Sequence, residues 1–260
     1  MTTDSKGRII VAEFSENQVS IFTPEWDKIQ SLEGNFYGPT GVTVDKDDNI
    51  YVVDNNNRIQ KFSSDGKFVA SVGYGSNIFT SVIYGNSNPL QFKNPLGIGF
   101  NKKNGKLHVC DQGNDRMQIL GTDLTFHRMY GSRGSGNGQF NHPRNVAFDR
   151  CGNVYVADDH NHRIQVFTPG VTHLRTFGSE GNGPGELCVP AGVAIDGDRV
   201  YITERDNHRV SVFNIEGKFL KSFGSKGKEE AQFHTPRSVH VNKDGFILIA
   251  DDGNDRIQVF

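Results

Sequence analysis

Residues 154–167 read VYVADDHNHRIQVF: a short apolar run, a polar turn, and a second run in which apolar and polar residues alternate. The pattern returns five more times, most weakly near the N-terminus. The copies are residues 9–22, 50–62, 107–120, 200–213 and 246–260. Recurrence at a regular spacing is the sequence signature of a repeat architecture, in which each repeat forms one supersecondary unit.

An acidic residue ends the first apolar run of every copy and measures the spacing of the repeats. These residues are Glu13, Asp54, Asp111, Asp158, Glu204 and Asp251. Their successive separations are 41, 57, 47, 46 and 47 residues. We therefore expect one domain of six units, at about residues 1–38, 39–94, 95–142, 143–189, 190–235 and 236–260.

The fourth unit shows what one repeat contains. Alternating or apolar runs at residues 145–149, 154–157, 163–167 and 173–177 predict four strands, and residues 150–153 and 158–162 predict turns. Helical periodicity is missing, and the one tryptophan–aspartate dipeptide, Trp26-Asp27, lies in an irregular segment and does not recur as it would in another propeller repeat. Leucine-rich and ankyrin repeats need a helix or 3-10 turn, which this pattern does not predict. The sequence thus predicts an all-β, six-bladed β-propeller with four-stranded antiparallel blades.

Composition limits the classes of partner. The chain has 260 residues, of which 35% are hydrophobic and 22% are charged, and its formal net charge is −2. Without a global positive field we expect no DNA binding, and RNA binding needs a local basic patch. The longest apolar runs fall short of the about 20 residues that cross a bilayer, so we expect no membrane partner. Three scattered cysteines predict neither a zinc site nor a disulfide framework and fit a cytoplasmic protein.

Two irregularities stand out. The linker at residues 73–95 is ten residues longer than its counterparts and carries an apolar cluster of Ile78, Phe79, Val82, Ile83 and Tyr84. We expect this insertion to fold back as a lid rather than to face a partner, because exposed aliphatic clusters are a liability. The first blade has at most residues 1–3 for its innermost strand, and the last ends with its third strand. Both end blades are therefore expected to be incomplete.

The turn and the start of the third strand carry a resemblance to a known family. The sequence Asn161-His162-Arg163 resembles the NHL repeat, and Asn207-His208-Arg209 matches it closely. The units with Arg58, Arg116 and Arg256 keep the asparagine and the arginine, whereas the first unit lacks the arginine. The resemblance implies a six-bladed propeller. In the sequence pattern of its repeats and linkers, the chain resembles the C-terminal domains of tripartite-motif NHL proteins.

That resemblance implies a role in target recognition. Tripartite-motif NHL proteins are ubiquitin ligases and post-transcriptional regulators, and their propellers bind protein substrates or single-stranded or hairpin RNA. We expect the same role here, with any ligase activity residing in modules upstream of such a domain. A protein-interaction scaffold without RNA binding is the alternative that the sequence cannot separate from it.

The repeated arginines are expected to be structural. An arginine five residues after an aspartate, across a tight turn, can form a bidentate pair with that carboxylate or with a neighbouring blade's. A residue that recurs at the equivalent position of each repeat usually serves the fold rather than ligand recognition. We extend this interpretation to the motif residues Asn161, His162, Arg163, Asn207, His208, Arg209, Arg58, Arg116 and Arg256.

Positions that differ between repeats are better candidates for recognition. The residue after each linker proline is Thr40, Leu96, Arg144, Ala191 or Arg237, and a propeller places it at the channel mouth. We expect a basic ligand-binding cluster there, with phosphates held by arginine and bases stacked on nearby rings. The other members would be Asn145, His142, His234, Arg133, Lys226 and Lys228.

A metal-dependent enzyme is the remaining alternative. Some six-bladed propellers are lactonases, esterases or amidating lyases that hold calcium or zinc at the axis, which requires converging oxygen or imidazole ligands. Arginine at two of the five mouth positions would repel a cation, and His108 and His240 stand singly in strands, as buried structural histidines do. We therefore expect no metal, no cofactor and no catalytic residue in this domain.

Overall fold

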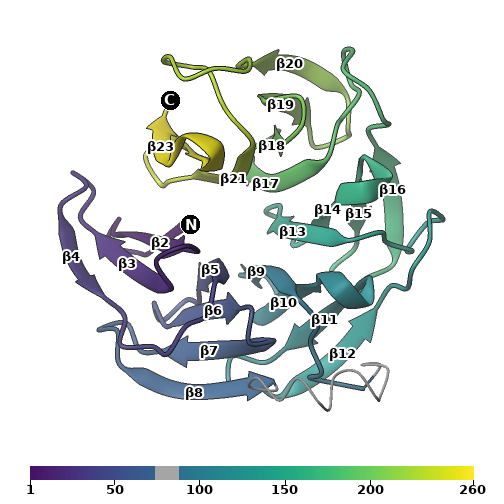
Figure 1. The fold of residues 1–260 in the computed structure, drawn as a ribbon. Coiled ribbons are helices and arrows are strands. Elements are labelled where there is room, and N and C mark those ends of the chain that lie inside the picture. The colour runs from purple at the N-terminus through teal and green to yellow at the C-terminus, as the bar shows by residue number, and fades with distance from the viewer. Residues whose placement is uncertain (74–87) are drawn as a thin grey trace. The chain divides into compact units, whose positions relative to one another are not determined.

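The computed structural model describes residues 1–73 and 88–260. It divides into two compact units, Met1–Arg133 (unit 1) and Gly134–Phe260 (unit 2). In the described residues the strands form six separate antiparallel sheets, and within each sheet neighbouring strands are also neighbours in sequence. This arrangement confirms the predicted all-β, six-bladed β-propeller fold (Figure 1).

Unit 1 holds the first three sheets. Its strands are β1 (Thr2–Thr3), β2 (Ile9–Glu13), β3 (Gln18–Phe22), β4 (Lys28–Ser31), β5 (Pro39–Val44), β6 (Ile50–Asp54), β7 (Arg58–Phe62), β8 (Phe68–Gly73), β9 (Pro95–Asn101), β10 (Lys106–Asp111), β11 (Arg116–Leu120) and β12 (Phe126–Tyr130). The 3-10 helix η1 (Gln112–Asn114) joins β10 to β11.

Unit 2 holds the other three sheets. Its strands are β13 (Pro143–Phe148), β14 (Val154–Asp158), β15 (Arg163–Phe167), β16 (His173–Phe177), β17 (Pro190–Asp196), β18 (Arg199–Glu204), β19 (Arg209–Asn214), β20 (Phe219–Phe223), β21 (Pro236–Val241), β22 (Ile247–Asp251) and β23 (Arg256–Val259). The 3-10 helices η2 (Asp159–Asn161) and η3 (Asp252–Asn254) follow β14 and β22.

Burial explains the pattern of each blade. Strand β14 is buried along its whole length, so its β-branched and apolar residues meet neighbours on both faces. Strand β16, at the edge of the same sheet, is mostly half-buried, with Leu174 exposed and Phe177 buried. Blades pack through the faces of such sheets: Tyr155 and Val166 of one blade share a core with Val200 and Phe213 of the next. The buried area that stabilises a blade thus comes largely from its neighbour.

Differences from the sequence-based expectations are local. In the fourth unit the first strand begins at Pro143 rather than at residue 145, and the second reaches Asp158. The expectation that 3-10 turns are missing was wrong, because η1, η2 and η3 occupy the turn after the second strand in three blades. The ends are short as expected: β1 has two residues, and the last sheet has three strands in the described chain. The expected lid falls on residues 78–84, outside the described residues.

Candidate recognition face of unit 2

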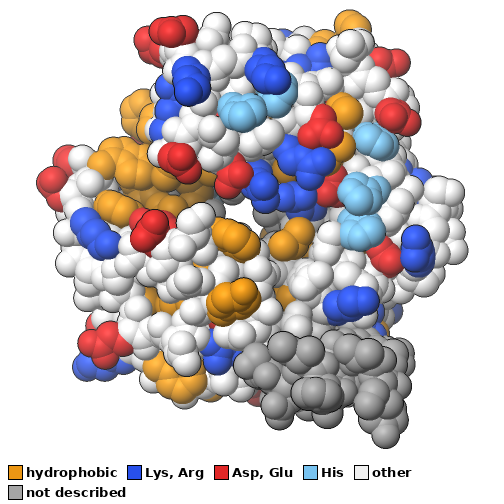
Figure 2. All heavy atoms as spheres, in the orientation of Figure 1, with side chains coloured by type: hydrophobic (Ala, Val, Ile, Leu, Met, Phe, Trp, Pro, Cys, Tyr) orange, Lys and Arg blue, Asp and Glu red, His pale blue; other side chains and the backbone are white. Residues whose placement is uncertain are grey.

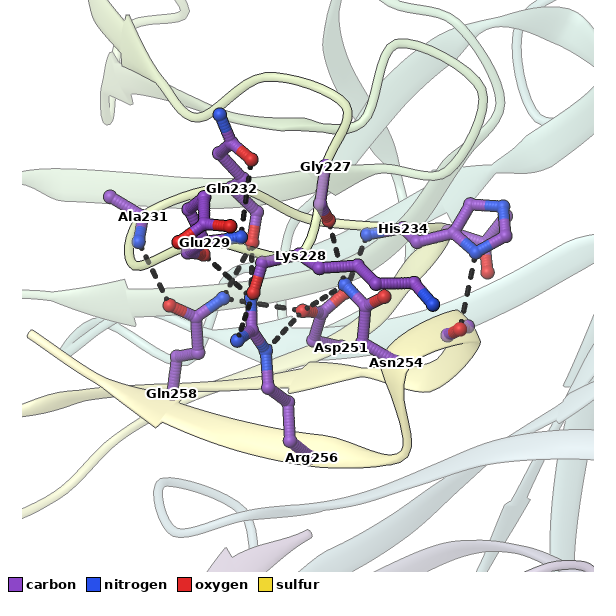
Figure 3. A network of polar contacts seen from close by, with 12 residues as sticks. Gly227, Lys228, Glu229, Ala231, Gln232, His234, Asp251, Asn254, Arg256 and Gln258 are labelled. Carbon is purple, nitrogen blue, oxygen red and sulfur yellow. Dashed lines mark hydrogen bonds and ion pairs between the residues drawn. The ribbon is translucent and has the colours of Figure 1, made fainter.

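A buried carboxylate at the end of the second strand organises five of the six repeats, and Figure 3 shows the one in the last blade. Asp251 is fully buried. Its oxygens accept hydrogen bonds from the backbone N–H of His234 (2.6 Å), Nδ2 of Asn254 (2.8 Å), Nε of Arg256 (2.8 Å) and Nε2 of Gln258 (3.2 Å). Because four donors surround it, this carboxylate can stay charged inside the protein.

The arginine of the repeat spans the turn and the preceding linker. Arg256 donates its remaining N–H groups to the backbone carbonyls of Lys228, Glu229 and Gln232. The same Nε-to-carboxylate contact, at 2.7–3.0 Å, is made in four other blades by Arg58, Arg116, Arg163 and Arg209. The fork-like bidentate pair that the sequence suggested is not the main geometry, since in most blades only Nε faces the carboxylate and the other nitrogens hold the linker.

The histidine of the repeat links neighbouring blades. His162 and His208 both have φ of 52°, a left-handed conformation, and the Nδ1 atom of each accepts a backbone N–H from the next linker. The donors are Val189 (3.2 Å) and Thr235 (3.1 Å). In unit 1, Asn57 Oδ1 accepts the N–H of Asn94 in the same way (2.8 Å). A neutral imidazole is required for this contact, because a protonated Nδ1 would be a donor.

The surroundings of His208 favour its neutral imidazole. Partial burial, followed by the nearby positive charge of Lys226 and the neighbouring His234, lowers the pKa of His208, while Asp206 and Asp251 oppose this shift. A lowered pKa favours the neutral imidazole that accepts the hydrogen bond from Thr235.

The residues after the linker prolines are bulge residues, and this sets where they point. Strand β13 pairs with β14 at Pro143 and again at Asn145, so Arg144 falls in a register shift. The same shift isolates Ala191 in β17 and Arg237 in β21. A β-bulge re-aims the side chain of the extra residue. Three neighbouring first strands therefore present an arginine, an alanine and an arginine at equivalent places.

Each of these arginines meets an aspartate of the turn after the second strand. Arg144 donates to Oδ2 of Asp159 at 3.0 Å, and the side chains are 13% and 2% exposed. Arg237 pairs with Asp252 at 2.7 Å, and these side chains are half exposed, at 50% and 45%. One pair is therefore anchored in the protein, whereas the other faces solvent.

The middle blade reverses this arrangement. It has Ala191 on the first strand and Arg205 in the turn, where the adjacent blades have Asp159 and Asp252. Arg205 pairs with its neighbour Asp206 at 2.7 Å, and the side chains are 29% and 46% exposed. We call Arg144, Arg205 and Arg237, with Asp159, Asp206 and Asp252, the arginine cluster. Figure 2 shows basic, acidic and histidine side chains gathered on this face of unit 2.

The pKa values of Arg144 and Arg205 respond to the neighbouring charges of the cluster. Burial lowers the pKa of Arg144, and the charges of Arg237 and Arg205 lower it further, against the opposing effect of Asp159. The hydrogen bond from Arg205 to Asp206 raises the pKa of Arg205, with a smaller contribution from Asp159. All three arginines remain charged, since arginine does not deprotonate in proteins. Three positive and three negative charges make the cluster neutral overall.

The structure brings some of the other predicted residues close to the cluster. The ring of His142 lies 4.4 Å from that of His160, and the ring of His234 lies 5.6 Å from that of His208. Asn145 uses Oδ1 to accept the N–H of Val193 (3.4 Å), a contact between β13 and β17.

The predicted linker cations lie outside the cluster's ion pairs. Lys226 and Lys228 are exposed on the linker before β21, and Lys228 uses its carbonyl to accept from Arg256. Arg133 is exposed and is the last residue of unit 1. The ligand-binding role of all these residues stays a prediction.

Sequence reasoning missed the acidic half of the cluster as partners of the arginines. Arg144 and Asp159 are 15 residues apart, and so are Arg237 and Asp252. Because Pro143 pairs with Asp158 in antiparallel register, Arg144 and Asp159 lie on either side of that pair, and the side chain of the bulge residue Arg144 reaches back to Asp159. A repeated separation between opposite charges was therefore a usable signal in the sequence.

The described residues do not offer the ligand set of a metal enzyme: no three histidine, cysteine, aspartate or glutamate side chains are grouped there so that they could hold an ion. His108 is buried, and this burial lowers its pKa to about 3, so its imidazole is neutral. His240 is half-buried rather than buried as expected. Cys110, Cys151 and Cys188 are free thiols. The described part of the chain has no helix with the length and apolar character needed to cross a membrane.

Comparison with solved structures identifies the fold. A streptogramin B lyase superposes with a TM-score of 0.70 at 14% identity, over 99% of this chain and 76% of that one. Virginiamycin B lyase from Staphylococcus aureus gives 0.68 at 14% identity, over 100% and 82%. An auxiliary nutrient binding protein from Bacteroides thetaiotaomicron gives 0.73 at 14% identity, over 99% and 67%. Identities this low show a shared fold and nothing finer.

Sequence comparison identifies the repeat. No curated protein sequence gives a significant match to the chain. The family model of the NHL repeat matches residues 36–62, 140–167 and 187–213, each of which ends with the third strand of a blade. The chain is therefore a six-bladed β-propeller that contains NHL repeats.

Proposed function

We propose that this chain is a recognition domain that binds a protein ligand through the arginine cluster of unit 2. The observation that carries the proposal is the contrast between positions. The carboxylate–arginine contacts recur in all three blades of unit 2, whereas the bulge and turn positions carry arginine and aspartate in two of these blades and alanine and arginine in the third. Exposed charged groups held on rigid strands suit the recognition of one partner over others.

The neutrality of the cluster favours protein over RNA. Asp206 and Asp252 are 46% and 45% exposed, and they already pair with two of the three arginines. A phosphodiester chain brings a negative charge with every nucleotide, so these carboxylates would oppose it. A protein surface of mixed charge meets no such penalty.

The resemblance to tripartite-motif NHL proteins extends the proposal beyond these residues. In that setting the recognised protein would be a substrate for ubiquitin transfer, or a component of a post-transcriptional regulator. Two of the similar structures are lyases, but at 14% identity they share only the fold with this chain, and we do not propose a lyase activity.

The proposal is tested by quantitative capture. The purified chain and the double variant Arg205→Ala with Arg237→Ala are immobilised and exposed to extract with and without ribonuclease. Arg150→Ala is the matched control, because Arg150 is 77% exposed and pairs weakly with Asp198 at 3.7 Å. We expect a set of proteins that is lost with the double variant and kept with the control and after ribonuclease. Capture that the double variant does not change, or that ribonuclease abolishes, would contradict the proposal.

A further inference from the structure

The arginine cluster is built so that three blades contribute one guanidinium group each. Arg144 and Arg237 come from β13 and β21, and β17 lies between these strands. The equivalent residue of β17 is Ala191, which is buried and small. Arg205 reaches the cluster from the next turn of the same blade, where its backbone N–H donates to the carbonyl of Val189 (3.1 Å). The middle bulge position therefore carries no charge, and the third guanidinium group comes from the turn instead.

The three ion pairs differ in how firmly they are held. The pair of Arg144 with Asp159 is almost completely buried, so Asp159 fixes the position of Arg144. The pairs of Arg237 with Asp252 and of Arg205 with Asp206 are partly exposed, and such pairs contribute little to stability. Arg237 and Arg205 can therefore exchange one carboxylate partner for another at small cost.

We infer that the arginine cluster binds the carboxylate side chain of an acidic peptide segment of the partner. This inference rests on the proposed function and names the chemistry that the same face recognises. An Asp or Glu of the ligand would take the place of Asp252 on Arg237 or of Asp206 on Arg205. Arg144 keeps its pair with Asp159 and adds its positive charge to the site. The planar guanidinium fork suits a carboxylate, which it can bind with two parallel hydrogen bonds.

Spacing of charge explains why a peptide fits this cluster. The arginines alternate with aspartates, so an entering chain must place negative charge at one or two points and neutral groups elsewhere. A peptide does this by separating acidic residues with uncharged ones. The displaced side chains of Asp252 and Asp206, at 45% and 46% exposure, can turn into solvent because they are not enclosed.

Selection from a random peptide library displayed on phage tests the inference. The intact chain is the bait, and the affinity of the enriched peptides is measured by fluorescence anisotropy. We expect peptides with one or more Asp or Glu, whose affinity falls about tenfold with Arg237→Ala or Arg205→Ala and is unchanged with Arg150→Ala. Replacing the essential acidic residue of the peptide by Gln should cause a similar loss in the wild-type chain and no additional loss in the arginine variant.

The other outcomes separate this inference from the proposed function. Enriched peptides without acidic residues that still lose affinity with Arg237→Ala would overturn the carboxylate inference and leave the recognition face intact. Peptides that bind all variants equally would overturn both. Failure to enrich peptides, with or without binding of a 20-nucleotide single-stranded RNA probe, would also count against both.

Discussion

At the scale of single residues, arginine has two different uses in this chain. The arginine of each repeat is bound to a buried carboxylate and to linker carbonyls, so all of its donors serve the fold. The arginines at bulge positions instead make one ion pair each, and half of the Arg237 side chain stays exposed whereas Arg144 is largely buried. The first use was predictable from the equal spacing of Asp158 and Arg163 and their counterparts. The second was predictable only in part, because the sequence does not show which aspartates lie opposite.

Removal of a repeat arginine should be costly. Arg163→Ala would leave Asp158 fully buried without its charged partner and would release the linker carbonyls of Ser135, Gly136 and Gln139. We expect a loss of about 3 kcal/mol in the free energy of unfolding, as for breaking a buried ion pair. Urea denaturation measures this loss, and Arg150→Ala should change the midpoint hardly at all. A loss below about 0.5 kcal/mol would show that the buried pair does not stabilise the fold.

The repeat histidine makes stability depend on pH. The pKa of His208 is lower in the folded protein than its ordinary value of about 6.5, so the unfolded chain binds the proton more tightly. The contribution of the His208–Thr235 contact is therefore fully present above about pH 6.5 and is lost as the pH falls through the lower folded pKa.

The variant His208→Asn tests this dependence. Asparagine accepts the corresponding N–H in unit 1, where Asn57 has φ of 58°, so the contact should survive without a titrating group. We expect urea midpoints at pH 7.5 and pH 5.5 to differ less in His208→Asn than in the wild-type chain. An equal difference in both proteins would assign the acid sensitivity to other groups.

At the scale of elements, the sequence predicted the strands well and their irregularities poorly. Period-two alternation and a buried apolar run marked β14 and β15 correctly, because burial on one or both faces dictates side-chain type. The 3-10 helix η2 was not predicted, since its polar residues also fit an ordinary turn. The bulge at Arg144 depends on pairing between two strands, which leaves no mark on either strand alone.

Close approach of first strands makes a specific prediction. A Cβ atom on Gly192 would lie 2.9 Å from Cα of Ser238 and 2.9 Å from the backbone nitrogen of Val239, both on the adjacent β21. Because backbone cannot move aside as a side chain can, Gly192→Ala should lower the free energy of unfolding by about 1–3 kcal/mol. Urea denaturation would show this, with Gly170→Ala as the control, since a Cβ there meets only Oγ1 of Thr168 at 3.7 Å. Equal midpoints would mean that the strands separate readily.

At the scale of the whole molecule, contacts that recur in the repeats hold the fold, and positions that differ between repeats form the candidate recognition face. Five of the six repeats build similar carboxylate-centred contacts, and the recurrence of the pattern along the chain predicted the six-bladed fold. The candidate site occupies positions where repeats differ, and there the residue types could be read from the sequence but their pairing could not. Opposite charges that neutralise one another look like a basic patch when only the arginines are followed along the chain.

The composition of the site also predicts the response to chelators. In the described residues no group of three potential metal ligands exists, and two bulge positions carry arginine. We expect the thermal midpoint of the purified chain to be the same with and without EDTA, and elemental analysis to find no stoichiometric ion. A bound ion at one equivalent, with a lowered midpoint after chelation, would revive the metal-enzyme alternative.

The most direct test of the recognition face is a map of its arginine side chains by NMR. With a selected peptide added to the nitrogen-labelled chain, the Nε–Hε signals are followed and assigned by single substitutions. We predict that the signals of Arg144, Arg205 and Arg237 shift and approach saturation together, while those of Arg150 and Arg163 stay in place. Unchanged cluster signals, with shifts elsewhere in the chain, would contradict the claim that this face selects the partner.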